Sequence, residues 1–574
     1  MKTLSHALLL LLPLIPFSFA LVRGSADSGS GVSFDLQAYI DREVKAGKKL
    51  IEINPGRYRV TPRNRAHLRL QNLDNLSIDA TGVEMVCTET TRALTIENCR
   101  ALTLIGLTID YDPLPFTQGR IVNMSPDGLI HDIELFEGYP TSGEITGTKY
   151  EIFRSDTRTL RFGSYYGCTV TSPEPGRLRV VKPDNYRNQH PEQVGDIIAT
   201  ACANAPGGSI PHAVHIKNSN QVKLEAVRLY ASNCFGFFET HCKENVYRQC
   251  IVQRRPAMTD IKPRADPRIR SLNADAYHSK YAEVGPSYIE CEAQFQGDDC
   301  VAINGDYHMI MATLGNELRV LAKKELNIVE GDSVELISYE GLRLPDAIVV
   351  SVTPDGNINN SEKAFLKSQR MNDNLKNNRQ GSLTKAFRIL VDRNITLPMG
   401  SLICSAHRIG NGFIVMDCTF GFNRSRGILV KASQGIIQGN QLEGCWGSAI
   451  KLAPEYWWLE AGSSMDVVIN DNDIRNCLER AIVVSSQGGQ GQVSPAGAHT
   501  NITINGNRIV NSPIPQIRVT STDQLNIENN TILDSRQLRL DHAIELENCT
   551  NATVSRSNRT MIVEGGGIDR ELDR

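Results

Sequence analysis

The sequence predicts an all-β protein, a right-handed parallel β-helix, from three observations. Weak repeats of about twenty to twenty-five residues run along much of the 574-residue chain. Each repeat contains a short β-rich run that ends at Asn, Gly, Asp or Ser, and several share the pattern apolar-x-Ile-x-x-Asn. In a parallel β-helix, alternate residues of each short strand point inward and stack on the coil below. A β-sandwich or a propeller is the alternative, but these strands are too short and too evenly spaced for either.

Asparagine recurs at one position of the repeat, just after each β-rich run. At a turn, asparagine tolerates a left-handed backbone and can form hydrogen bonds along a stack of coils. We therefore expect asparagines to be stacked at a fixed turn of the column. The runs that show the repeat most clearly are residues 76–80, 94–98, 102–106, 467–472, 502–507 and 525–530.

The first twenty residues have the features of a secretory signal peptide. Lys2 supplies positive charge, residues 8–17 are apolar, and Ser18 and Ala20 offer small side chains before a cleavage point. A membrane anchor is the alternative, although the apolar run is short for a spanning helix. No later stretch is long and apolar enough to span a bilayer, so we expect a secreted or periplasmic protein without stable membrane insertion.

Residues 21–110 are expected to form an N-terminal cap and the first coils. Ser33 can cap a short helix that ends at Gly47, and a strand, a Pro-Gly turn and a second strand follow from Leu50. A helix here would cover the open end of the column, which would otherwise expose apolar rungs and unpaired backbone. The apolar positions at helical spacing are Leu36, Tyr39, Ile40 and Val44.

Two stretches interrupt the repeat, residues 111–211 and residues 306–408. Both are β-rich and long enough to be small domains, so we expect two inserted β-barrel-like domains. They could wall a substrate cleft, or they could mediate the formation of a homodimer. Residues 212–305 then form the central coils, and residues 409–574 form the C-terminal coils and a tail.

Composition excludes some classes of partner. The formal net charge is only −3, and no long run of Lys and Arg provides the basic face that nucleic acid requires. The fourteen cysteines include no C-x-x-C pair, so a zinc site is not expected. Several cysteines directly follow an asparagine at the end of a β-rich run, as at Cys99 and Cys477. We expect most cysteines to be buried fillers at one recurring turn, with a few disulfides as the alternative.

Three aspartates provide the candidate chemistry. Asp275 lies in Asn-Ala-Asp-Ala-Tyr-His, while Asp298 and Asp299 lie in Gly-Asp-Asp-Cys-Val-Ala-Ile-Asn. The separation 299 − 275 = 24 equals one coil, and successive coils stack at about 4.8 Å. The three carboxylates are therefore expected on neighbouring rungs of one face.

Carboxylates this close cannot all ionise freely, so at least one pKa rises, as a general acid requires. Another carboxylate stays ionised and can activate a water, which is the pairing that glycoside hydrolysis needs. In the inverting geometry the two groups lie roughly 6.5–9.5 Å apart. A solvated turn or a calcium site are the alternatives, although the repeated Gly-rich pattern of calcium-binding solenoids is missing. We expect no metal and no cofactor.

The fuller pattern resembles the inverting α-1,3-galactosidases of glycoside hydrolase family 110. Asn-x-Asp followed one coil later by Gly-Asp-Asp is similar to polygalacturonase-type β-helix hydrolases, but the Gly-His-Gly segment of that group is absent. Its Arg-x-Lys is matched only loosely, by Arg426 and Lys431. The large β insert after Gly-Asp-Asp and the segment Arg426–Lys431 instead resemble family 110. The resemblance covers nearly the whole mature chain.

The resemblance implies hydrolysis, with inversion, of terminal α-1,3-linked galactose on blood-group B type glycans or linear Galα1-3Gal ends. It implies Asp298 as the general acid, with Asp275 and Asp299 activating the water. The alternatives are a polygalacturonase-like hydrolase of acidic pectic sugars and a non-catalytic carbohydrate-binding solenoid.

Other residues expected on the same face could line the sugar pocket. Each also has a structural interpretation, as a packed aromatic or as a hydrogen-bonding group of the column. The loop at residues 454–458 carries aromatic side chains that either rim the cleft or pack against the protein. The candidates for substrate binding are Glu239, His278, Asn304, Arg426, Lys431 and Trp446.

Overall fold

The computed structural model describes residues 34–141, 145–202 and 211–562, apart from the side chains of residues 145–148. Residues from Asp35 onward form one compact unit. The signal peptide expected at residues 1–20 lies outside the described residues. Within the described residues, no helix is long and apolar enough to cross a membrane.

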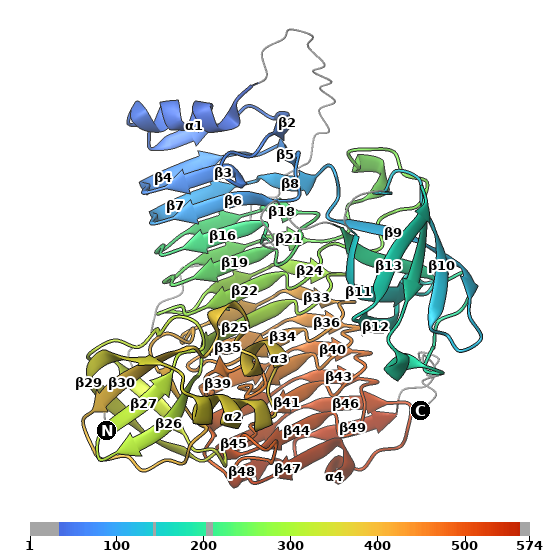
Figure 1. Cartoon of the computed structure of the whole chain (residues 1–574). Helices are drawn as coiled ribbons and strands as arrows, with labels where there is room; N and C mark the ends of the chain where they lie inside the picture. Colours follow the sequence, from blue (N-terminus) through green and yellow to red (C-terminus); the bar gives the residue numbers. More distant parts are fainter. Residues whose placement is uncertain (1–33, 142–144, 203–210, 563–574) are drawn as a thin grey trace. The chain divides into compact units, whose positions relative to one another are not determined.

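Three long parallel sheets form the faces of a column (Figure 1). Each coil adds a strand to each sheet, and the inward side chains form one continuous core that is mostly Ile, Leu, Val and Ala. The β-helix predicted from the repeats is confirmed. The first sheet contains β1 (Leu50–Glu52), β4 (Asp74–Asp79), β7 (Arg100–Ile105), β17 (Lys223–Glu225), β20 (Val246–Arg248), β23 (Ser287–Ile289), β32 (Ile414–Met416), β35 (Ile436–Gln438), β39 (Met465–Asn470), β42 (His499–Asn505), β45 (Thr522–Glu528) and β48 (Thr550–Val554).

The second sheet follows the first after a short turn in each coil. It contains β2 (Gly56–Val60), β5 (Val83–Cys87), β8 (Thr108–Tyr111), β18 (Arg228–Leu229), β21 (Ile251–Val252), β24 (Glu292–Gln294), β33 (Thr419–Gly421), β36 (Gln441–Glu443), β40 (Asp473–Arg475), β43 (Arg508–Val510), β46 (Thr531–Asp534) and β49 (Arg559–Ile562).

The third sheet carries the candidate site. Strand β38 (Glu460–Ala461) pairs antiparallel with its strand β25. The parallel strands of the third sheet are β3 (Ala66–Gln71), β6 (Arg92–Glu97), β16 (Val214–Lys217), β19 (Phe237–Thr240), β22 (Tyr277–Lys280), β25 (Val301–Asp306), β34 (Ile428–Val430), β37 (Ile450–Leu452), β41 (Ile482–Val484), β44 (Ile517–Thr520) and β47 (Ile544–Glu547).

An asparagine ladder joins the coils at the turn between the first and second sheets. From the second asparagine of the ladder onward, each Oδ1 accepts from the backbone N–H and the side-chain Nδ2 of the asparagine one coil earlier, at 2.9–3.1 Å. The stacked asparagines expected from the repeat are therefore present. The ladder consists of Asn440, Asn472, Asn507, Asn530 and Asn558.

Cysteines take the place of asparagine in earlier coils of the same turn. Cys418 donates its backbone N–H to Asn440 at 3.0 Å, and Cys291 lies one coil before Cys418. All fourteen cysteines are free thiols, and twelve are buried. The cysteines are buried as predicted, and the disulfide alternative is wrong. The prediction of one recurring turn is also wrong, because Cys99, Cys291 and Cys477 lie at three different turns of the coil.

The capping helix α1 (Leu36–Lys45) lies beside the first coil, where Gln37 donates to the carbonyl of Arg69 at 3.0 Å. Its N-cap is Asp35, which accepts from the backbone N–H of Ala38 at 3.0 Å. The prediction of Ser33 as the cap placed the start of the helix two residues too early. Ser33 itself lies outside the described residues.

The first insert is an open antiparallel sheet of seven strands. No pairing joins its edge strands β12 and β13 in the described part of the chain, so this insert is not closed into a barrel. Short 3₁₀ turns, η1 (Asp184–Tyr186) and η2 (Ala257–Thr259), lie in this insert and after β21. The strands are β9 (Phe116–Met124), β10 (Ile130–Leu135), β11 (Ile145–Phe153), β12 (Leu160–Tyr166), β13 (Thr169–Glu174), β14 (Arg177–Val181) and β15 (Ile197–Cys202).

The second insert is a closed six-stranded barrel, as predicted (Figure 1). Its elements are β26 (His308–Leu314), β27 (Glu317–Leu321), β28 (Ser333–Ile337), β29 (Arg343–Asn357), α2 (Asn360–Ser368), α3 (Asp373–Lys376), η3 (Arg379–Gly381), β30 (Lys385–Val391) and β31 (Ser401–Ser405). A last short helix, α4 (Leu540–Ala543), precedes β47.

Candidate active site

The register of the third sheet stacks Asp275, Asp299 and Arg426 on consecutive coils. The first residues of β22, β25 and β34 are partners in parallel register. The three site residues each lie two positions before one of those partners, in the turn that leads into the strand. Stacking of parallel strands therefore places them on adjacent rungs.

The structure brings the three carboxylates together. One oxygen from each of Asp275, Asp298 and Asp299 lies within 4.8 Å of the others. Oδ2 of Asp275 lies 2.7 Å from Nδ1 of His278, and Oδ1 accepts from the backbone N–H of Asp299 at 3.3 Å. These oxygens are closer together than the gap of roughly 6.5–9.5 Å expected for an inverting pair.

Arg426 holds Asp299 through two contacts. Its backbone N–H donates to Oδ1 of Asp299 at 2.8 Å, and its guanidinium lies 3.0 Å from Oδ2. Asp298 pairs instead with Arg424, and Nζ of Lys149 lies 3.9 Å away. The two adjacent aspartates therefore have separate cationic partners.

These environments separate the pKa values of the pair. Burial raises the pKa of Asp299 to about 7, with a further rise from the neighbouring Asp275 and Asp298 carboxylates and only partial opposition from Arg426. Burial would also raise the pKa of Asp298, but Arg424 and then Lys149 reverse its effect and hold that pKa below the usual value. One group can thus carry a proton near neutral pH while its neighbour is ionised.

The three aspartates also differ in accessibility. The Asp298 side chain is 30% exposed, whereas those of Asp275 and Asp299 are 8% and 4% exposed. Asp298 is therefore the carboxylate that a bound molecule can reach most directly.

The first insert contributes two charged side chains that sequence analysis missed. Lys149 of β11 approaches Asp298, as described above, and Glu151 of the same strand is buried. Nε of Arg270 donates to Glu151 at 2.9 Å, and Arg424 lies 3.8 Å from it. No repeat aligns this insert with the coils, so nothing in the sequence pointed to these contacts.

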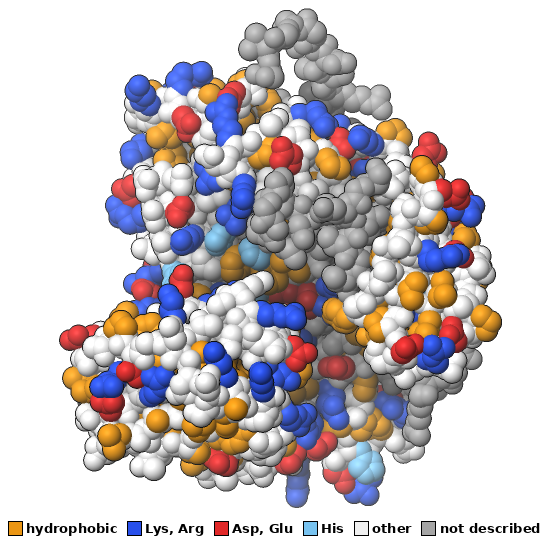
Figure 2. All heavy atoms as spheres, viewed as in Figure 1, with side chains coloured by type: hydrophobic (Ala, Val, Ile, Leu, Met, Phe, Trp, Pro, Cys, Tyr) orange, Lys and Arg blue, Asp and Glu red, His pale blue; other side chains and the backbone are white. Residues whose placement is uncertain are grey.

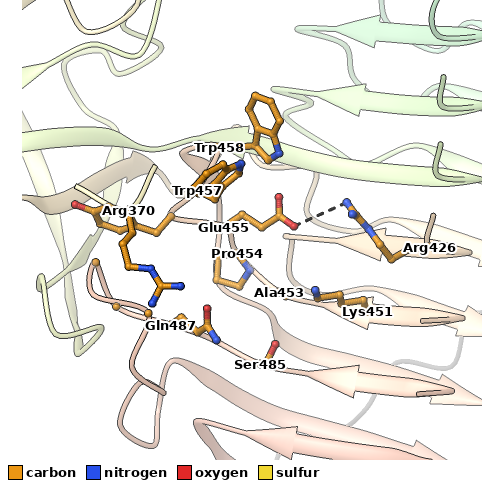
Figure 3. A pocket seen from close by; sticks show the side chains of 14 residues that line it. Arg370, Arg426, Lys451, Ala453, Pro454, Glu455, Trp457, Trp458, Ser485 and Gln487 are labelled. Atoms are coloured by element: carbon orange, nitrogen blue, oxygen red, sulfur yellow. Dashed lines mark ion pairs between the residues drawn. The ribbon is translucent and has the colours of Figure 1, made fainter. Parts of the chain in front are cut away.

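A cavity of about 390 Å³ is lined in part by Arg426, the residue that holds Asp299. Lys451, Glu455 and the loop tryptophans Trp457 and Trp458 line it (Figure 3). In Figure 2 the surface is hollowed between the barrel and the first insert, and charged side chains gather in the hollow. The loop at residues 454–458 therefore rims a cavity, with only its Tyr456 packed inside the protein.

His278 and Asn304 lie beside the aspartates, where sequence analysis expected them. Nε2 of His278 accepts from the Asn304 amide at 3.2 Å, which leaves Nδ1 to donate to Asp275. Oδ1 of Asn304 is buried and has no hydrogen-bond partner within the described residues. The Phe235 ring stacks on His278 with centroids 4.5 Å apart.

Glu239 does not face the site, contrary to the prediction. It accepts from Asn245, Tyr247 and Ser279 at 2.9, 3.0 and 2.6 Å inside the column. Burial raises its pKa despite these hydrogen bonds. The error is one of parity, because adjacent strand residues face opposite sides and Phe238, not Glu239, is in register with His278.

Lys431 and Trp446 also differ from the prediction that they line a sugar pocket. Lys431 is fully buried, and its ammonium lies 2.6 Å from Glu460. Trp446 packs against the first insert, where its ring meets Phe162 edge-on at 6.4 Å and leaves no room for a side chain at Gly163. Both residues support the walls around the site.

The same three carboxylates are close enough to hold a cation. Each already has a partner, however: Asp275 has His278, Asp298 has Arg424, and Asp299 has Arg426. A calcium site needs oxygen ligands that are free to coordinate. The donor set therefore does not fit calcium.

The family described as right-handed beta helix region matches residues 400–532. Alpha-1,3-galactosidase B of Bacteroides thetaiotaomicron is 24% identical over 558 residues, covering 89% of this chain and 82% of that protein. Alpha-1,3-galactosidase A of the same organism is 21% identical over 524 residues, covering 87% and 85%.

Among solved structures, the Family 28 exopolygalacturonase of Yersinia enterocolitica aligns with a TM-score of 0.37 at 10% identity, covering 90% of this chain and 74% of that one. The curated relatives confirm the resemblance drawn from the aspartate motifs. The chain is a right-handed β-helix glycoside hydrolase, related over most of its length to two proteins named as α-1,3-galactosidases.

Proposed function

We propose that the protein is an exo-acting hydrolase that removes terminal α-1,3-linked galactose from blood-group B type glycans or linear Galα1-3Gal ends. The observation that carries the proposal is the stack of three carboxylates with separated pKa values beside a cavity. The names of the two curated relatives supply the galactose and its linkage.

Asp298 is the general acid in this proposal, because it is the carboxylate that a leaving oxygen can reach. In the free protein, Asp299 holds a proton up to about pH 7. Asp298 and Asp299 titrate as a coupled pair, and in this proposal their shared proton lies on Asp298 when substrate occupies the site. Asp275 and Asp299 then activate the attacking water.

The proposed stereochemical outcome is inversion. A spacing within 4.8 Å is close to that of a retaining pair, which is roughly 5–5.5 Å, so distance does not support this outcome. Its support is the third carboxylate: a retaining mechanism uses two groups, whereas here two can hold a water while the third donates a proton. NMR of the first-formed galactose tests this, since inversion yields the β-anomer and retention the α-anomer.

The terminal galactose would lie against His278 and Asn304. These two side chains are buried and bonded to each other, and Oδ1 of Asn304 offers an unused acceptor to a sugar hydroxyl. Two buried side chains bonded to each other would close the site behind the terminal sugar, as an enzyme that removes one terminal residue requires.

The lysine suggested for binding a uronate carboxylate is not free to do so. Lys431, a candidate for binding a uronate carboxylate, is buried against Glu460, and Glu455 lies 3.8 Å from Arg426. The cavity lining carries Arg370, Arg426 and Lys451 beside Glu455, so the preference for galactose rests on the names of the two curated relatives. Galactose release from an α-1,3-galactoside, with none of galacturonate from oligogalacturonides, is the expected result, and the reverse specificity would overturn the proposal.

We also propose that residues 1–20 direct the protein to the periplasm or the outside of the cell. The short apolar run after Lys2 supports this. N-terminal sequencing of the mature protein is expected to begin near residue 21.

A further inference from the structure

We propose that the cavity beside Arg426 is the subsite for the leaving-group sugar, the pyranose to which the terminal galactose is joined. This inference rests on the proposed function. Arg426 forms part of the lining of the cavity of about 390 Å³ and lies 3.0 Å from Asp299. A sugar in this cavity would therefore adjoin the scissile bond.

The side chains on the two sides of the aspartate stack differ in how exposed they are, and this difference sets the direction in which the substrate binds. Along the strands that carry the aspartates, on the same two coils, His278 is 7% exposed and Asn304 is 1% exposed. On the side of the later coils, Trp457 and Trp458 are 49% and 43% exposed at the cavity. An exo-acting enzyme needs a closed end for the terminal residue and an open end for the rest of the glycan, which places the leaving group at the tryptophans.

The barrel holds these tryptophans in place. Tyr456, next to them in the loop, is packed in the barrel core and donates to the carbonyl of Gly400 at 3.0 Å. The carbonyl of Trp457 accepts from the backbone N–H of Asn372, the N-cap residue of α3, at 2.9 Å. A loop backbone fixed in this way keeps the two indoles at the cavity, where an indole face can stack on the apolar face of a sugar.

Lys451 provides a polar contact for the same sugar. It lines the cavity with Ser485 and Gln487 (Figure 3). Within the described residues it makes no hydrogen bond and no ion pair, and burial lowers the pKa of its ammonium. A half-buried ammonium without a partner gains an acceptor when a sugar hydroxyl enters.

The experiment compares two substrates that share the galactose but differ in the leaving group. Galα1-3Galβ1-4Glc places a sugar in the cavity, whereas α-galactosyl fluoride places none there. We expect Lys451→Met and Trp457→Ala each to lower kcat/KM for the trisaccharide about tenfold relative to the fluoride. Lys367→Met, an exposed lysine on α2, is the matched control and is expected to leave that ratio unchanged.

Each outcome decides between the two proposals. If the wild type hydrolyses neither substrate, the proposed function fails. If the wild type hydrolyses both and the two variants leave the ratio unchanged, or lower both rates equally, the subsite is wrong. A binding readout complements the rates: lactose is expected to change the tryptophan fluorescence of the wild type and to have a smaller effect in Trp457→Ala, and an equal effect in both proteins would also overturn the subsite.

Discussion

The shifted pKa of Asp299 predicts how hydrolysis depends on pH. Burial raises this pKa from 3.8 to about 7. At pH 6, about nine-tenths of the molecules would carry the proton, and above pH 7 the fraction would fall about tenfold per pH unit. We therefore expect kcat/KM for Galα1-3Galβ1-4Glc to be roughly one hundred times lower at pH 9 than at pH 6, because the leaving oxygen needs this proton.

The assay measures initial rates of galactose release from pH 5 to pH 9, with α-galactosyl fluoride as the matched substrate. Fluoride leaves without protonation, so its rate is expected to lack the falling limb near pH 7. The same raised pKa means that stability falls as pH rises from about 4 to about 7, by about 4 kcal/mol for Asp299, so unfolding is followed at each pH. A falling limb that is identical for both substrates, or centred near pH 4, would refute the reasoning.

Three further predictions follow from individual contacts. Arg426→Gln is expected to move the falling limb to higher pH, because the guanidinium lowers the pKa of Asp299; a limb at unchanged or lower pH would contradict this. Glu239→Gln is expected to keep KM for α-galactosyl fluoride within about twofold of the wild-type value, because the side chain lies inside the column. A tenfold rise in KM would show that Glu239 contacts the sugar after all. Asn472→Ala is expected to lower the free energy of unfolding in urea by about 1–3 kcal/mol. Asn526→Ala, two coils later and outside the ladder, is expected to lower it by less than about 0.5 kcal/mol, and equal effects would argue against the ladder.

The coils of the β-helix could be predicted because the sequence repeats its apolar pattern once in each coil. A separation of 24 residues equals one coil, which was enough to stack Asp275 with Asp299. The same periodicity has a weakness, since a shift of one residue along a strand moves a side chain to the other face. That is how Glu239, rather than its neighbour Phe238, came to be expected in the site.

The inserted part of the site could not be predicted, because it depends on contacts between distant segments. Lys149 approaches Asp298 from a strand outside the repeat, 149 residues earlier in the sequence. The position of Trp457 depends on the barrel, through Tyr456 and the N-cap of α3. Neither contact has a spacing or motif that would reveal it.

The most direct test of the central claim is the turnover of Galα1-3Galβ1-4Glc by Asp298→Asn, with Asp541→Asn as an exposed control. If the stacked carboxylates perform the hydrolysis, kcat for Asp298→Asn falls by about a hundredfold to ten-thousandfold, while its Tm stays close to that of the wild type. Turnover by Asp298→Asn at the rate of the control would contradict the account.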